Sequence, residues 1–444
     1  MSDAMSTNLH QDAIADRPLD RRDAKTLLLS ALGGALEFYD FVMFAYFTKV
    51  LSALFFPATM PEWLRLLETY GIFAVGYLAR PLGGIVMAHF GDIIGRKRMF
   101  ALSVFLMAVP TLLMGLLPVY AQVGALAPVL LLLLRIVQGV AIGGEVPGAW
   151  VFVAEHVPPR RMGLACASLS AGLTVGILIG SLVAQGLNSH MSQADILDHG
   201  WRFPFLLGGV FGFFAVYLRR WLSETPVFMR MRERRELSPE LPVKVVLTHY
   251  LPGVALSMLV TWVLTAAIVV VILMTPTIVQ TAFKVPAPLA FTGASLAALG
   301  LTFGCIGGGL LVDAVGRGLA MLLGSLCLGV ATYALFFDLT MGGAHFLPLY
   351  TLAGFFAGIS GIVPAVLVSA FPPNVRFSGI SLSYNVAYAI LAAMTPPLVG
   401  YMAKSLGGLA PAHYVGGVAV IGVLCGVYLL AARRRLRAQG NTVS

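Results

Sequence analysis

Long apolar segments, repeated along almost the whole chain, constrain this fold more than any other feature. They lie at about residues 26–56, 65–90, 98–119, 126–155, 161–188, 202–222, 246–280, 288–312, 319–340, 345–371, 378–404 and 411–432. A helix needs about 20 apolar residues to cross a bilayer, so each segment can cross once. Because 58% of the residues are hydrophobic and only 11% are charged, little sequence is left for a soluble domain. The sequence therefore predicts an all-α membrane protein with twelve transmembrane helices.

The basic residues predict which side of the membrane each loop faces. Most of the 29 Lys and Arg residues lie before the first segment, in alternate loops, in the mid-chain connector and after the last segment. By the positive-inside rule, both termini and the connector are expected to be cytoplasmic. The expected parts are a tail (1–25), a six-helix bundle (26–222), a cytoplasmic connector (223–245), a second six-helix bundle (246–432) and a second tail (433–444).

Short motifs recur between the two predicted bundles. The loop 91–96 returns in weaker form at 312–317, and the turn 158–163 is echoed at 372–379. Repeats of this kind are typical of transporter folds that are built from two related units. We therefore expect the two bundles to be pseudo-symmetric.

Several classes of function are excluded by what the chain lacks. The net charge of +9 follows the predicted topology, and the basic residues are not interleaved with aromatic ones, so nucleic acid is not an expected partner. The four cysteines show no CxxC spacing, and no metal site or cofactor is expected. There is no Walker A sequence and no paired Ser/His/Asp set, so the protein is not expected to be an enzyme.

Ionisable residues inside the first six apolar segments are the strongest functional signal. They are Glu37, Asp40, Arg80, Arg135 and Glu145. A charged side chain at mid-bilayer costs about 2.5–3.5 kcal/mol, so each should face a cavity and have a partner. The set holds three acids and two bases, and an odd acid in a low-dielectric environment tends to hold a proton, because burial disfavours the charged carboxylate. These acids are therefore candidate proton carriers.

An ordered set of motifs runs through the whole chain. It comprises residues 37–41, 80–84, 88–97, 135–139, 143–145, 200–205 and 224–226. The set resembles the major facilitator superfamily and, within it, the metabolite:proton symporters, which include α-ketoglutarate, citrate, shikimate and proline/betaine permeases. The resemblance implies a proton-coupled symporter in the bacterial inner membrane that imports a small carboxylated metabolite by alternating access. A monomer is expected, with protons, the lipid bilayer and the small molecule as partners.

Asp40 and Arg135 are the expected proton-coupling pair. Their placement is similar to that of the Asp of the first helix and the Arg of the fourth helix in sugar/proton symporters. Protonation of Asp40 would release Arg135 and permit the conformational change. Glu37 and Glu145 are further coupling candidates. The alternative is that these residues form static ion pairs that hold the helices together.

Arg80 is the expected substrate residue, because its planar guanidinium suits a carboxylate. Further expected substrate contacts are Tyr39, Arg135, Gln138, Trp262, Tyr384, Asn385 and Tyr388. Tyr384, Asn385 and Tyr388 share one helical face. Such a polar stripe serves hydrogen bonding between helices as often as it serves ligand binding, and the sequence leaves both interpretations open.

A cytoplasmic gate is the last expected site. Asp92, Arg96, Lys97 and Glu155 lie at the predicted cytoplasmic edge, where they could form a salt-bridge latch. The alternative is an orientation signal in a solvated loop.

Three other functions stay open at this stage. The first is uptake of a zwitterionic osmolyte such as proline or betaine, for which one carboxylate contact and an aromatic box for the ammonium group would be enough. The second is export of a metabolite or drug by proton antiport, although residues 172–180 lack the Gly-Pro-x-x-Gly-Gly pattern of such antiporters. The third is a membrane sensor, for which an intact coupling pair would be unnecessary.

Overall fold

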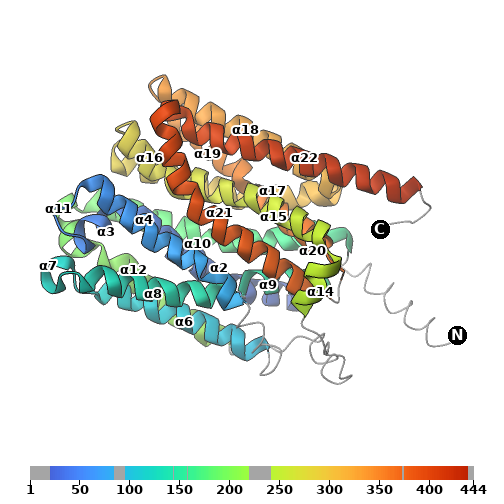
Figure 1. The fold of residues 1–444 in the computed structure, drawn as a ribbon, viewed down its shortest axis with the longest axis horizontal. Coiled ribbons are helices and arrows are strands. Elements are labelled where there is room, and N and C mark those ends of the chain that lie inside the picture. The colour runs from blue at the N-terminus through green and yellow to red at the C-terminus, as the bar shows by residue number, and fades with distance from the viewer. Residues whose placement is uncertain are drawn as a thin grey trace.

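Helices joined by short turns make up the structure, and no strand occurs in the part of the chain that it describes (Figure 1). This computed structural model describes residues 21–84, 96–143, 145–157, 159–219, 242–372 and 375–438. The predicted all-α class is thus confirmed.

The first half of the chain (residues 21–219) begins with two helices that meet at a bend. The elements of this half are α2 (Arg21–Tyr46), α3 (Thr48–Phe55), α4 (Glu62–Leu78), α6 (Arg96–Leu116), α7 (Tyr120–Val123), α8 (Leu126–Ile142), α9 (Glu145–His156), η1 (Pro159–Arg161), α10 (Met162–His190), α11 (Gln193–Asp195), η2 (Ile196–Gly200) and α12 (Arg202–Arg219). A further helical stretch, 80–84, continues α4 after a one-residue turn.

The second half (residues 242–438) contains α21, which with 31 residues is the longest helix in the described part. Its elements are α14 (Pro242–His249), α15 (Leu251–Ala266), η3 (Ala267–Met274), α16 (Thr275–Ala282), α17 (Ala287–Val315), α18 (Arg317–Thr340), α19 (Phe346–Ala357), η4 (Gly358–Gly361), α20 (Val363–Ser369), α21 (Arg376–Leu406), η5 (Gly407–Leu409) and α22 (Ala410–Ala438).

Seven helices among the described residues are long and apolar enough to cross a membrane, or nine if each of two bent pairs counts as one span. The bends are 63° between α2 and α3, and 45° before α12. One of the seven stretches, 376–432, holds both α21 and α22. The predicted number of twelve crossings and the orientation of the termini stay predictions.

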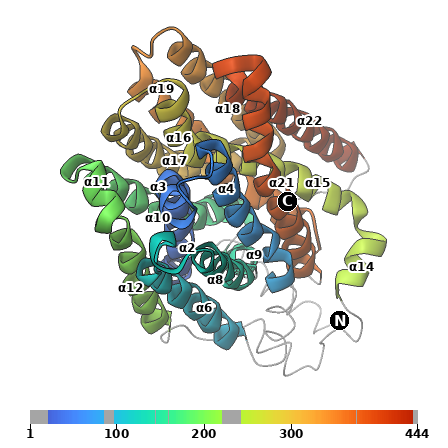
Figure 2. The same cartoon turned by 60° about the vertical axis from the view of Figure 1, so that its left-hand side comes forward.

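The helices of each half pack mainly on one another. In the first half, α2 packs on α10 and α12, α6 packs on α8 and α12, and α4 packs on α8. In the second half, α15 packs on α21 and α22, while α18 packs on α19 and α22. Figures 1 and 2 show the blue-to-green helices on one side and the yellow-to-red helices on the other. The boundaries of the two predicted bundles stay predictions.

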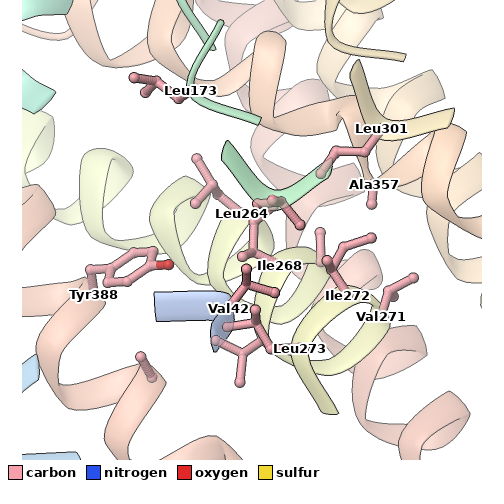
Figure 3. Packing of buried hydrophobic residues seen from close by; sticks show 14 of the residues in the cluster. Val42, Leu173, Leu264, Ile268, Val271, Ile272, Leu273, Leu301, Ala357 and Tyr388 are labelled. Atoms are coloured by element: carbon pink, nitrogen blue, oxygen red, sulfur yellow. The ribbon is translucent and has the colours of Figure 1, made fainter. Parts of the chain in front are cut away.

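The most extensive contacts between the halves are those of α10 with α17 and of α4 with α21. The apolar core continues through this contact, where all eight residues of the π-helical segment η3 are buried. In Figure 3, Ile268, Ile272 and Leu273 of η3 lie beside Val42 of α2. The wider π-helical turn is stabilised by Thr275, whose hydroxyl donates to the carbonyl of Val270 at 2.8 Å. The halves therefore meet through a dry, closely packed centre.

Candidate functional site

Asp40 of α2 and Arg135 of α8 are in direct contact. Arg135 Nη1 lies 3.0 Å from Asp40 Oδ2, and the two side chains are 2% and 0% exposed. A buried charge is costly unless it is paired and hydrogen-bonded. Here the carboxylate of Asp40 and the guanidinium of Arg135 compensate each other's charge. The structure thus brings the two expected coupling residues together. The side chains of Glu37 and Glu145 lie outside the part that the structure describes.

Two further polar residues close a ring of hydrogen bonds around this ion pair. Arg135 Nη1 donates to Gln138 Oε1 at 3.0 Å, and Gln138 Nε2 donates to Thr111 Oγ1 at 2.8 Å. Thr111 Oγ1 in turn lies 2.9 Å from Asp40 Oδ1 and 2.8 Å from the carbonyl oxygen of Met107. The single hydroxyl hydrogen of Thr111 serves one of these acceptors at a time. The ring ties α2, α6 and α8 together.

Thr111 has no counterpart among the sequence-based expectations. It follows Pro110 in an apolar segment, and a lone Thr in such a segment usually bonds its own backbone, as Thr111 also does here with Met107. Nothing in the sequence indicates which face of α6 meets Asp40, so this residue could be found only from the packing.

Aromatic rings surround the guanidinium of Arg135. Its Cζ atom lies 3.8 Å from the centroid of the Phe44 ring and 5.7 Å from that of Phe73. Contact with ring faces stabilises a cation by about 0.5–2 kcal/mol. The charge of Arg135 is therefore balanced by one carboxylate and two rings.

Arg80 lies between tyrosines from both halves. It is 2% exposed, and its Cζ atom is 4.8 Å from the ring centroid of Tyr388 and 6.0 Å from those of Tyr77 and Tyr384. Tyr77 belongs to α4, whereas Tyr384 and Tyr388 belong to α21. A buried guanidinium is thus placed where the two halves meet.

Glycines bring the helix of Arg80 against α8. A Cβ atom added at Gly143 would overlap the carbonyl oxygen of Arg80, and one added at Gly139 would overlap the carbonyl oxygen of Gly76. Only glycine permits this close approach of two backbones. As a result, Arg80 and Arg135 project from two helices in close contact.

Six buried aromatic residues form a continuous cluster across the two halves, which we call the aromatic cluster. Its members are Phe44, Phe73, Tyr77, Trp150, Tyr384 and Tyr388. Neighbouring ring centroids are 4.9–5.8 Å apart, and the contact between Tyr77 and Tyr388, at 5.4 Å, joins the halves. Such distances are typical of favourable ring pairs. The two arginines lie against this cluster.

Asn385 makes a hydrogen bond from the second half to the first. Its Nδ2 donates to the carbonyl oxygen of Gly143 at 2.5 Å, and the side chain is 1% exposed. Nδ2 also lies 3.1 Å from the position that a Cβ of Gly84 would occupy. Asn385 therefore lies beside Gly84, one helical turn after Arg80, and on the same helix as Tyr384 and Tyr388.

The polar groups of two other expected substrate residues form hydrogen bonds within their own half. The hydroxyl of Tyr39 donates to the carbonyl of Pro204 at 2.7 Å. The indole nitrogen of Trp262 donates to the hydroxyl of Tyr414 at 3.0 Å, and that hydroxyl lies 2.7 Å from Thr395 Oγ1. The structure does not bring these polar groups to Arg80.

The expected gate residues cannot be placed, because Asp92 and the side chains of Arg96, Lys97 and Glu155 lie outside the described part. Asp313, in the repeat of the Asp92 loop, contacts the first half through hydrogen bonds to the backbone. Its carboxylate accepts from the backbone N–H groups of Gly163 and Leu164 at 2.8 and 3.1 Å. A carboxylate is favourable at a helix N-terminus, so Asp313 of α17 joins the halves at the start of α10.

Contacts also join the halves further along α10. Thr174 Oγ1 lies 3.0 Å from Thr302 Oγ1, and Gln185 Nε2 donates to Thr292 Oγ1 at 3.0 Å near the far end. Beyond α10, the rings of Tyr46 and Phe291 are 5.4 Å apart. The halves therefore touch at both ends of α10 as well as at the aromatic cluster.

The comparisons with known proteins agree with this architecture. The sequence profile of the Major Facilitator Superfamily matches residues 32–393. The chain belongs to this superfamily. This membership shows a multi-pass membrane transporter and confirms the expectation that the protein is not an enzyme.

The names of two relatives of this chain include substrates. The chain is 30% identical over 437 residues to the proline/betaine transporter of Escherichia coli (strain K12), with 94% of this chain and 85% of the relative covered. It is also 30% identical over 426 residues to the glycine betaine/proline/ectoine/pipecolic acid transporter OusA of Dickeya dadantii (strain 3937), with 92% and 84% covered.

Among solved structures, the proton:xylose symporter XylE bound to 6-bromo-6-deoxy-D-glucose has the same fold. The TM-score is 0.76 at 17% sequence identity, with 92% of this chain and 95% of XylE covered. At this identity the likeness concerns the fold alone.

Proposed function

We propose that the protein is a proton-coupled symporter that imports a small zwitterionic solute of the proline or betaine kind by alternating access. The observation that carries the proposal is the position of Arg80 among Tyr77, Tyr384 and Tyr388. A guanidinium can bind a carboxylate, and ring faces can bind an ammonium group. Both kinds of group lie together at the contact between the halves.

This proposal reverses the order of two expectations from the sequence. From the sequence alone, a carboxylated metabolite was the preferred substrate and a zwitterionic osmolyte was the alternative. The printed names of the 30% identical relatives, proline/betaine and glycine betaine/proline/ectoine/pipecolic acid transporters, support the second. The aromatic cluster supports the zwitterion as well, because a simple carboxylate has no cationic group that ring faces could bind.

The ring of hydrogen bonds supports a coupling role for Asp40. When Asp40 is charged, Thr111 donates to it and Arg135 pairs with it. When Asp40 is protonated, it can donate to Thr111 Oγ1, which then donates to the carbonyl of Met107, 2.8 Å away. Both protonation states thus keep their hydrogen bonds, while only the protonated state releases the charge of Arg135. The released guanidinium becomes available to the substrate carboxylate.

The membrane arrangement in this proposal follows the basic residues. Twelve helices cross the bacterial inner membrane as two six-helix bundles, with both termini and the connector in the cytoplasm. The transport unit is a monomer, because the charged and aromatic groups of the site come from the two halves of one chain.

Uptake into proteoliposomes tests the proposal. The purified protein is given an inward proton gradient and labelled L-proline, glycine betaine, α-ketoglutarate or citrate, each with and without a protonophore. We expect L-proline or glycine betaine to accumulate, and the accumulation to disappear with the protonophore. Accumulation of the carboxylates alone would restore the organic-acid interpretation, and proton-driven extrusion would indicate an exporter.

A further inference from the structure

A buried hydrogen-bond acceptor at the contact between the halves is not accounted for by the interactions described above. Asn385 Oδ1 is buried and has no hydrogen-bond partner among the described residues. A buried acceptor without a partner is destabilising by an amount similar to that of a lost hydrogen bond, and such atoms are rare. The same side chain is 1% exposed, so solvent does not compensate.

The orientation of this amide is determined by its surroundings. Nδ2 faces the carbonyl oxygen of Gly143 at 2.5 Å. With the amide turned over, two oxygens would face each other at that position, which is repulsive. Ser381 Oγ, 3.4 Å away, also lies on the Nδ2 side. The unpartnered atom is therefore the oxygen, which can only accept a hydrogen bond.

Asn385 lies on the same helix as two of the rings proposed to bind a zwitterion, and its amide contacts the first half near Gly84, one turn after Arg80. Its neighbours on α21 are Tyr384 and Tyr388, whose rings lie near Arg80. A zwitterion has a carboxylate for the guanidinium and a nitrogen for the rings. If that nitrogen carries a hydrogen, it is also a donor, and Asn385 Oδ1 needs a donor.

We propose that Asn385 selects among zwitterions by accepting a hydrogen bond from the ammonium N–H of the substrate. The inference rests on the proposed function and adds its substrate class: solutes with a secondary or tertiary ammonium bind more tightly than fully methylated ones. A quaternary ammonium satisfies the rings but leaves Oδ1 unpaired. An N–H donor on Oδ1 also holds the amide in the orientation in which Nδ2 reaches Gly143, so that binding favours the contact between the halves.

A series of ligands with one ring and a decreasing number of N–H groups tests the proposal. L-proline, N-methyl-L-proline and N,N-dimethyl-L-proline carry two, one and no N–H hydrogens as zwitterions. Each competes with labelled L-proline for the purified wild-type protein in nanodiscs, and affinities below the reach of competition are measured by thermal stabilisation. We expect removal of the last N–H to weaken binding about 10- to 100-fold, the usual range for leaving a buried polar group unpaired. Removal of the first should have a much smaller effect.

The variant Asn385→Leu separates hydrogen bonding from steric exclusion. Leu has a similar size but no acceptor, so we expect weaker L-proline binding and a series in which the three ligands differ by less than about 3-fold. Asn188→Leu is the matched control, because Asn188 Nδ2 donates to the carbonyl of Ala184 in its own helix, and it should keep the wild-type series. If Asn385→Leu does not fold, Asn385→Ala takes its place.

Each other outcome counts against a stated part of the proposal. A flat series in the wild-type protein, or a series that keeps its slope in Asn385→Leu, would overturn the role of Asn385 while leaving the proposed function intact. Binding of none of the three ligands, with binding of α-ketoglutarate or citrate, would overturn the proposed function and the selection by Asn385 with it.

Discussion

The two halves contribute different chemistry to one site. In the described part, the first half provides the ionisable groups Asp40, Arg80 and Arg135, whereas the second half provides the neutral side chains Tyr384, Asn385 and Tyr388. Hydrogen bonds of Asp40 and Arg135 connect α2, α6 and α8, all in the first half. Ring contacts with Tyr384 and Tyr388 join Arg80 to the second half.

This difference has a physical reason. Separating a buried ion pair leaves an uncompensated charge and costs about 3–5 kcal/mol. If the halves rock against each other during transport, an ion pair between them would oppose the movement. A pair within one half moves as a unit, and rings and amides on the other half can part at a smaller cost. The first half is therefore suited to proton coupling, and the second half is suited to forming the wall of the substrate site.

The largest expected effect is that of Asp40→Asn on the charged half. Asn keeps the shape and can still accept from Thr111, but it cannot bind and release a proton. We expect gradient-driven accumulation of L-proline to be abolished, while exchange of internal for external L-proline continues. Uptake and exchange in the same proteoliposomes measure this. Accumulation by the variant at the wild-type level would remove Asp40 from proton coupling.

The next effect is that of Arg80→Lys, which keeps the charge but removes the planar fork. We expect the affinity for L-proline to fall about 10- to 100-fold, as for the loss of a hydrogen bond to a charged group. Arg202→Lys is the control, because Arg202 Nη1 donates to the carbonyls of Gly115 and Leu117, both at 2.9 Å, away from the aromatic cluster. Equal affinity in both variants would argue against direct binding by Arg80.

A smaller effect is expected from Tyr388→Leu on the neutral half. Loss of one ring face should weaken glycine betaine binding about 3- to 30-fold, because a ring contributes roughly 0.5–2 kcal/mol to binding a cation. Tyr388→Phe keeps the ring and should bind glycine betaine nearly as well as the wild type. If Leu and Phe weakened binding equally, the hydroxyl rather than the ring face would be the group that matters.

The smallest effect concerns the contact of Asp313 with the start of α10. Asp313→Ala removes the acceptor for two backbone N–H groups, a loss of about 1 kcal/mol, which is the typical value for a helix cap. We expect the halves to part more often there, so that the buried thiol of Cys166 reacts with N-ethylmaleimide about 2- to 10-fold faster. The other three cysteines are replaced by Ser for this measurement.

A matched variant at the exposed end of α18 shows whether this effect is local. Asp338 accepts from the backbone N–H of His345 at 3.0 Å, within the second half. Asp338→Ala should leave the reactivity of Cys166 unchanged. An equal increase in both variants would mean that Asp313 stabilises the fold in general and does not join the halves.

Local signals in the chain determined the helical class and the most conspicuous site residues. Long apolar segments can satisfy their backbone in a membrane only as helices. Charges are so rare in these segments that Asp40, Arg80 and Arg135 stand out without any structure. The sequence also showed that the loop at 91–96 is repeated at 312–317, but only the structure showed that Asp313 joins the halves there.

Tertiary structure alone decided which neutral residues join those charges. Thr111, Phe73 and Trp150 lie among mainly apolar residues, where periodicity does not separate a face toward lipid from one toward another helix. Tyr39 and Trp262 were equally plausible from the sequence, yet their polar groups bond to Pro204 and Tyr414. A charged residue in an apolar helix is stable only with a partner, so its presence in the sequence already indicates a site. A ring or a hydroxyl is stable in many surroundings, and its position is determined only by the packing around it.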